Sequence, residues 1–133
     1  MRLFKKLFIQ CTLSLFFFPL HAQNKPEEVR AVWFTTNWNL DWPSPGKTPD
    51  EQKKELRRLL DQLQQANINT IFFQARIRGD VFYKSKIEPW SPYFQKDISV
   101  GAYAAYDPLA YAIEECHKRG IECHAWVVTF PLG

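Results

Sequence analysis

The sequence is poor in the residues that hold metals and phosphates. It has three cysteines, three histidines and five glycines in 133 residues. No CxxC pair and no histidine-rich spacing is present, which excludes the usual zinc motifs. Neither GxGxxG nor GxxxxGKS/T follows the first predicted strand, and this argues against a dinucleotide site or a phosphate loop. We therefore expect no cofactor and no metal.

A long hydrophobic run is also missing, and the main apolar stretch lies at the start of the chain. Leu7–Phe18 is mostly apolar, follows three basic residues and precedes the small residue Ala22. This order of basic, apolar and small residues is the pattern of a secretory signal peptide. About twelve apolar residues are too few for a permanent membrane span, so a membrane anchor is the disfavoured alternative.

An excess of one charge is absent once residues 1–22 are set aside as a signal peptide. The whole chain has 17 Lys+Arg and 14 Asp+Glu, and residues 1–22 hold three of the basic residues and no acidic one. The remainder is formally neutral and offers no basic surface for nucleic acid or anionic lipid. We predict an exported protein, periplasmic or extracellular, with no nucleic-acid partner and no stable membrane insertion after cleavage. Residues 23–28 are polar and are expected to be flexible.

Three strand patterns alternate with two helix patterns in the rest of the chain. The predicted elements are a strand over 29–36, a helix from Thr48 to Ala66, a strand from Ile68 to Gly79, a helix from Asp107 to Gly120 and a strand over 121–128. Each helix begins with a capping residue followed by proline, and Thr48 and Glu51 match a capping box. The β-α-β-α-β order predicts an α/β fold with parallel strands and right-handed crossovers. The alternatives are the start of a (β/α)8 barrel, which needs about 250 residues, and a small doubly wound sheet.

Polar and aromatic residues gather where the predicted strands end. Ligand sites in parallel α/β folds lie at the carboxyl ends of the strands. Gln74 and Arg76 share a strand face with Phe72, so this face becomes polar at its end. A loop of roughly 25 residues then follows Gly79, much longer than usual. The candidate substrate-binding residues are Asn37, Trp38, Gln74, Arg76, Asp80, His124 and Trp126.

Four segments together resemble a known family. They are EVRAVWFTTNWNLDWPS, NTIFFQARIRGDVFYKSKIEPWSPY, YDPLAYAIEECHKRG and IECHAW. From Glu28 to about Trp126 the chain resembles the N-terminal part of glycosyl-hydrolase-like family 10, which comprises exported bacterial barrel proteins distantly similar to amylase-type glycosidases. The motifs RAVW, QxRxRGD, EPWSPY and HAW occur in the family's order. The sequence departs from the common pattern after HAW, where Val127 and Val128 replace an Asn-Pro pair.

The resemblance implies a (β/α)8 TIM barrel that hydrolyses glycosidic bonds in polysaccharide, with bacterial cell-wall glycan as the leading substrate class. Residues 29–133 are then expected to be the first part of the catalytic domain, an incomplete barrel that is inactive alone. Similar glycosidases carry two catalytic carboxylates. The resemblance implies that these follow strands four and five, beyond residue 133. The alternative within this chain is Asp80, Glu88 or Asp41. A non-catalytic exported carbohydrate-binding or structural protein with a degenerate barrel is the other candidate function.

Several of the candidate residues have a structural alternative. Arg76 and Asp80 are expected to form an ion pair, which either closes the barrel mouth or binds sugar. His124 is interpreted as a hydrogen-bonded core histidine in preference to a base, and Trp126 as core or cleft floor. Trp38 and Trp42 stack on sugar or pack their own loops, and for Trp90 we favour packing because prolines bracket it. Cys116 and Cys123 are expected to be buried free thiols, with a disulfide as the less favoured alternative.

Overall fold

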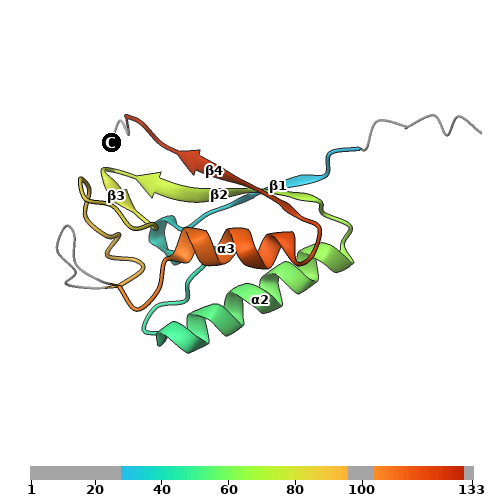
Figure 1. Ribbon diagram of the computed structural model, residues 1–133, viewed down its shortest axis with the longest axis horizontal. Helices are drawn as coiled ribbons and strands as arrows, with labels where there is room; N and C mark the ends of the chain where they lie inside the picture. Colours follow the sequence, from blue (N-terminus) through green and yellow to red (C-terminus); the bar gives the residue numbers. More distant parts are fainter. Residues whose placement is uncertain (1–27, 96–103, 131–133) are drawn as a thin grey trace, which may run out of the picture.

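The computed structural model describes residues 28–95 and 104–130 (Figure 1). The predicted signal peptide, residues 1–22, and most of the polar segment after it lie outside the described residues. The elements are β1 (Ala31–Phe34), the 3-10 turn η2 (Asn37–Asn39), α2 (Pro49–Gln65), β2 (Thr70–Ile77), β3 (Asp80–Val81), α3 (Pro108–His117) and β4 (Glu122–Val127). The predicted order of strands and helices is confirmed, and each strand is shorter than predicted by one or two residues at each end.

The sheet is built around β2. β1 pairs with β2 in parallel on one edge, and β4 pairs with β2 in parallel on the other. Both helices lie on the same side of this sheet (Figure 1). The result is a mixed α/β fold with sequential parallel strands, consistent with part of an α/β barrel.

One strand was not predicted. The sequence suggested a loop directly after Gly79, but β3 turns back there and pairs antiparallel with the end of β2. Arg78 and Gly79 both have positive φ, at 52° and 77°. Two such residues in succession form the tight turn that suits a hairpin.

The helices begin where the capping residues predict. The Thr48 hydroxyl accepts a hydrogen bond from the Glu51 backbone, and the Glu51 carboxylate accepts one from the Thr48 N–H at 2.9 Å. Asp107 caps α3 in the same way by accepting from Ala110 N–H at 2.9 Å. These bonds satisfy amide donors that the first turn of a helix leaves unpaired, which stabilises the helix start.

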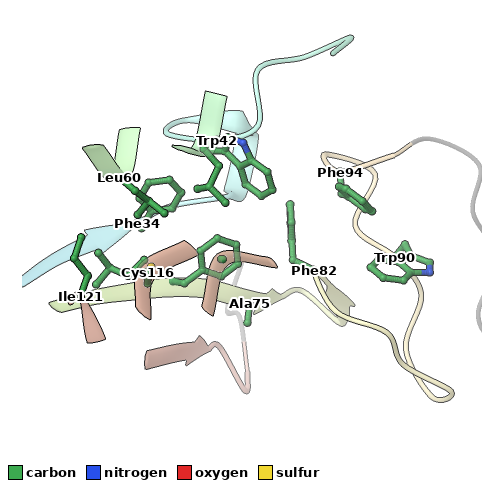
Figure 2. Close-up of a cluster of buried hydrophobic side chains, with 13 residues drawn as sticks. Phe34, Trp42, Leu60, Ala75, Phe82, Trp90, Phe94, Cys116 and Ile121 are labelled. Atoms are coloured by element: carbon green, nitrogen blue, oxygen red, sulfur yellow. The ribbon is translucent and has the colours of Figure 1, made fainter. Parts of the chain in front are cut away.

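The core fills the space between the sheet and the two helices (Figure 2). Phe73 of β2 packs against Phe34 of β1 with ring centroids 5.7 Å apart. Trp42 is fully buried and donates its indole N–H to the Gln52 carbonyl, so it belongs to the core. Trp90 is also buried and packs on Phe94, which confirms the packing interpretation. The loop after β3 is therefore anchored to the core by aromatic side chains.

Cys116 of α3 and Cys123 of β4 meet at the edge of this core as free thiols; Cys116 is buried as expected, whereas Cys123 is half-buried. The hydrogen bond between them, together with burial, raises the pKa of the Cys116 thiol. Neither α2 nor α3, the two α-helices among the described residues, is long and apolar enough to cross a bilayer.

The face of the sheet away from the helices carries aromatic side chains. Trp33 is 62% exposed, stacks on Phe72 at 4.7 Å and meets Trp126 edge-on at 4.9 Å. The predicted alternation in β4 is thus confirmed, with Trp126 on this face and Cys123 on the helix side. Among the described residues nothing covers Trp33, and this apolar face stays open.

Candidate functional site

The candidate site lies where β1, β2 and β4 end. We call this region the rim; it consists of residues 35–41, 76–80, 88–93 and 128–129. These stretches come from three strand ends and from the loop after β3, and hydrogen bonds join them directly. The expected clustering of polar residues at the strand ends is therefore present in the structure.

Gln74 fixes the chain as it leaves β1. Its side chain is only 2% exposed, and its amide oxygen accepts the backbone N–H groups of Thr36 and Asn37 at 3.1 and 2.9 Å. The Thr36 hydroxyl donates to the Gln74 backbone carbonyl at 2.8 Å. Gln74 thus sets the position of the next turn, and direct contact between Gln74 and a substrate stays a prediction.

The turn that Gln74 holds presents Trp38 to solvent. Trp38 and the following Asn39 both have positive φ, at 58° and 55°, and the Trp38 side chain is 66% exposed. Asn39 anchors the other end of the turn by donating its side-chain amide to the carbonyls of Pro43 and Tyr93 at 2.6 and 2.8 Å. Left-handed backbone is costly for a side chain as bulky as Trp, so these anchors impose it. The result is an exposed indole in a fixed place.

Arg76 pairs with Glu88 and not with Asp80, which corrects the expected ion pair. Its Nε lies 2.8 and 2.9 Å from the two Glu88 carboxylate oxygens, and a second nitrogen lies 2.5 Å from one of them. The remaining nitrogen donates to the carbonyls of Val128 and Thr129. Asp80 is directly opposite Ile77 in the hairpin, so its side chain leaves the face opposite to that of Arg76. The guanidinium lowers the pKa of Glu88 below its usual range.

Asp80 sits in a partly buried position at the base of the hairpin. Burial raises the pKa of its carboxyl, while the Ser91 hydroxyl and the charges of Arg78 and Arg76 act in the opposite direction. One carboxyl oxygen of Asp80 is buried without a hydrogen-bond partner among the described residues. Such a carboxyl holds its proton to higher pH than an exposed one, as a general acid requires.

Arg78 is a rim residue that the sequence interpretation took to be solvated and did not place among the candidate site residues. Its NH2 nitrogen donates to the Asn37 side-chain oxygen at 3.0 Å and to the Tyr93 hydroxyl at 2.9 Å. The guanidinium also lies over the Tyr93 ring, 5.5 Å from its centroid. An arginine at a hairpin turn usually points into solvent. Asn37 and Tyr93 are distant from Arg78 in the sequence, so only the folded structure shows that they are in contact.

His124 and Trp126 lie on the open aromatic face, below the rim. His124 pairs with Phe72 across the strands, and its ring nitrogen lies 3.2 Å from a Glu122 carboxylate oxygen. It is hydrogen-bonded as expected, but its side chain is 54% exposed and so it is not a core histidine. Trp126 is half-buried against Trp33. Both residues face the same open side as Trp33, which suits a cleft floor better than the helix-side core.

The other two carboxylates considered for catalysis are engaged in the structure. Asp41 accepts the Thr35 backbone N–H at 2.6 Å, and Glu88 is bound to Arg76. In the part of the chain that is described, no three acidic, histidine or cysteine side chains come close enough to hold a metal ion. Of the three acidic candidates, Asp80 alone has a free, buried carboxyl oxygen.

The comparisons with known proteins agree on one family. The family model described as glycosyl hydrolase-like 10 matches residues 28–132. The chain is 41% identical over 116 residues to glycosyl hydrolase YngK of Bacillus subtilis (strain 168), covering 86% of this chain and 22% of that protein. It is 36% identical over 123 residues to glycosyl hydrolase DigH of Escherichia coli (strain K12), covering 86% of this chain and 28% of that protein. The chain therefore spans between a fifth and a third of the length of these relatives.

Proposed function

Because the chain belongs to the glycosyl hydrolase-like 10 family, we propose that it acts in the hydrolysis of glycosidic bonds in polysaccharide. Two relatives that cover most of this chain carry the name glycosyl hydrolase, which supports the reaction class. We further propose that its strands form part of a (β/α)8 barrel and that the rim binds the glycan. Bacterial cell-wall glycan is the proposed substrate class, in keeping with the proposed export of the protein.

Trp38 is the observation that carries this proposal. The faces of sugar rings are apolar, and an exposed indole offers a flat, rigid surface on which a ring can stack. Trp38 is exposed although it is a large apolar side chain, and Gln74 and Asn39 hold its turn in a strained conformation. Strain of this kind concentrates at ligand sites. A stacking platform for a sugar ring accounts for both the exposure and the anchoring.

The other predicted residues fall into distinct roles around this platform. Asn37 lies next to the indole, and His124 and Trp126 extend the contact surface along the open face. Gln74 and Arg76 hold the loops through buried or bidentate hydrogen bonds. Asp80 is the candidate general acid, since glycosidases keep one carboxyl protonated to donate to the leaving oxygen. A partner carboxylate is not assigned, because Asp41 and Glu88 are engaged elsewhere.

A non-catalytic glycan-binding protein is the second candidate function. The engagement of Asp41 and Glu88 favours it, since of the three acidic candidates in the described part of the chain only Asp80 keeps a free carboxyl oxygen. The two functions share the Trp38 platform and differ only in turnover. An assay for reducing ends released from a bound glycan distinguishes hydrolysis from binding alone.

The test of the proposal is the substitution Trp38→Ala. We expect binding of soluble cell-wall glycan strands to weaken at least tenfold, about 1.4 kcal/mol, with an unchanged melting temperature. Leu40→Ala is the matched control, because Leu40 is an exposed apolar residue of the same loop and has no platform geometry. Equal glycan affinity in the Trp38→Ala variant and the wild type would contradict the proposal.

A further inference from the structure

We propose that Arg78 is a further glycan-binding residue, which donates hydrogen bonds to acceptor oxygens on the sugar next to the one stacked on Trp38. This inference rests on the proposed function and adds to it a residue that hydrogen-bonds to polar groups of the sugar. The observation behind it is a fixed, exposed guanidinium whose charge is not matched by a carboxylate.

The partners of Arg78 are neutral. Its hydrogen bonds go to the amide oxygen of Asn37 and the hydroxyl of Tyr93, at 3.0 and 2.9 Å. Among the described residues no carboxylate lies within ion-pair distance, and Asp80 acts on it only at longer range. Arg76 and Arg119, in contrast, each hold a carboxylate within 2.7 Å. Arg78 therefore keeps an unmatched positive charge at the rim.

Two of the three nitrogens of the Arg78 guanidinium keep their donors free. Within the described part of the chain, only its NH2 nitrogen makes hydrogen bonds, so the Nε–H and NH1 donors are unused. Nε–H and NH1 point to different sides of the guanidinium, so each donates to a separate acceptor oxygen. An arginine in this state offers hydrogen-bond donors to a ligand.

The side chain is also held in place before any ligand arrives. It stacks over the Tyr93 ring, and its two acceptors come from two different loops. Its backbone has φ of 52°, so Trp38, Asn39 and Arg78 are three left-handed residues other than glycine that meet at one rim. Fixing a long side chain in advance removes much of the entropy loss on binding. Arg78 touches Asn37, the residue before Trp38, so the two binding groups leave neighbouring parts of the rim.

Two kinds of sugar group accept hydrogen bonds from these donors. One is a ring hydroxyl, which any neutral glycan has, and the other is a carboxylate on an acidic sugar. A carboxylate forms the stronger, charge-assisted pair, and its binding weakens as salt is added. The ligand arms of the experiment distinguish them.

The experiment measures the affinity of the protein for two oligosaccharides of equal length, one neutral and one carrying a carboxylate. The variants are Arg78→Met and Arg78→Lys, with Arg58→Met as the matched control, because Arg58 is an exposed arginine of α2 bonded only to Gln62 among the described residues. We expect both Arg78 variants to bind at least tenfold more weakly and the Arg58→Met variant to bind like the wild type. A loss confined to the acidic oligosaccharide identifies a carboxylate, and an equal loss for both identifies ring hydroxyls.

A second measurement excludes an effect through Trp38. If Arg78 only positioned the Trp38 turn, the change Arg78→Met would have no effect in a Trp38→Ala background. We expect it to weaken binding there as well. Unchanged affinity of the Arg78→Met variant, or no effect in the Trp38→Ala background, overturns the inference and leaves the proposed function standing. A wild-type protein that binds neither oligosaccharide overturns both.

Discussion

At the scale of single residues, Asp80 carries the clearest chemical signal. Its carboxyl is pulled in two directions, because burial favours the protonated form while Ser91, Arg78 and Arg76 favour the ionised form. Burial is the larger effect and raises the pKa above its ordinary value of 3.8. The ionised carboxylate is thus less stable in the folded chain than in water, and this cost appears as the pH rises above 3.8.

The substitution Asp80→Asn separates a chemical role from a structural one. Asparagine keeps the shape and can accept the Ser91 hydroxyl, but it cannot ionise or donate an acidic proton. We expect the unfolding free energy at neutral pH to stay within about 1 kcal/mol of the wild type or to rise. In the complete barrel of which this chain is the proposed first part, glycan hydrolysis should fall at least tenfold, measured as reducing ends released per folded molecule.

Thermal stability and turnover of the Asp80→Asn protein test the structural role and the chemical role separately. Thermal melts and kinetics are recorded on the same preparation, so that any loss of folded protein is corrected for. Lower stability with unchanged turnover would make Asp80 a structural residue and remove it from the site.

At the scale of elements, α2 and α3 are joined by a partly buried charge network. Glu115 of α3 is buried and lies 2.8 Å from Lys118 and 2.7 Å from Arg119. Arg119 also lies 2.7 Å from Asp61 of α2. Burial raises the pKa of Glu115, but the hydrogen bonds from Lys118 and Arg119 outweigh it and the net pKa is lowered. The network therefore stabilises the fold when Glu115 is ionised.

The sign of this effect predicts how stability depends on pH. Because the pKa of Glu115 is depressed in the folded chain, its contribution is complete above the ordinary value of 4.5 and is lost as the pH falls below it. We expect Glu115→Gln to lower the unfolding free energy by about 1 to 2 kcal/mol at pH 7. The unfolding free energy of this variant should also decrease less than that of the wild type when the pH is lowered. Urea unfolding at pH 7 and at pH 3 measures both quantities.

The neighbouring Glu114 provides the matched control for Glu115. It pairs with the same Lys118 at 2.7 Å, but its side chain is exposed. Exposed pairs contribute little, so Glu114→Gln should change stability by less than about 0.5 kcal/mol. Equal effects of the two substitutions would show that burial of Glu115 does not matter.

Local signals made the elements predictable from the sequence. The Thr48 and Asp107 caps, the proline after each and the turn at Gly120 act within a few residues, so they mark helix ends directly. The β3 hairpin was missed because Arg78 takes the left-handed backbone that glycine usually supplies. A turn of this kind has no strong signature when one of its two central residues is an arginine.

The site was less predictable than the fold because its contacts are distant in the sequence. That strand ends would gather polar residues followed from the α/β order, and the structure places Trp38 and Arg76 there. The choice of Glu88 over Asp80 as the partner of Arg76 depends on which face of the hairpin each carboxylate occupies. The link between Arg78 and Asn37 joins residues 41 positions apart, and no local pattern predicts it.

At the scale of the whole molecule, the described sheet has an open face and two open edges. Trp33 is exposed on the face away from the helices, and among the described residues β1 and β4 each pair on one edge only. Open strand edges and exposed aromatic faces promote association between chains.

We therefore expect the 133-residue chain, produced alone, to associate with itself. Its mass in solution should rise with concentration, and its thermal unfolding should be broad. Trp33→Lys should lower the association, because it places a charge on the open face. Sedimentation or light scattering at several concentrations provides the measurement, and a monomer at every concentration with one sharp melting transition would refute the prediction.

The bonds of Arg76 also govern which parts of the rim open together. The backbone carbonyl of Arg76 accepts the Val128 N–H at 3.0 Å, and its side chain donates to the Val128 carbonyl. The same guanidinium also binds the Glu88 carboxylate. When the end of β4 detaches, both hydrogen bonds between Arg76 and Val128 break. The Arg76 guanidinium, which binds Glu88, then loses a contact that orients it. We therefore expect fraying of the end of β4 to loosen the loop at Glu88, because one guanidinium binds both. Amide groups on the two sides of the rim should then exchange with solvent at related rates, although 40 residues separate them in the chain.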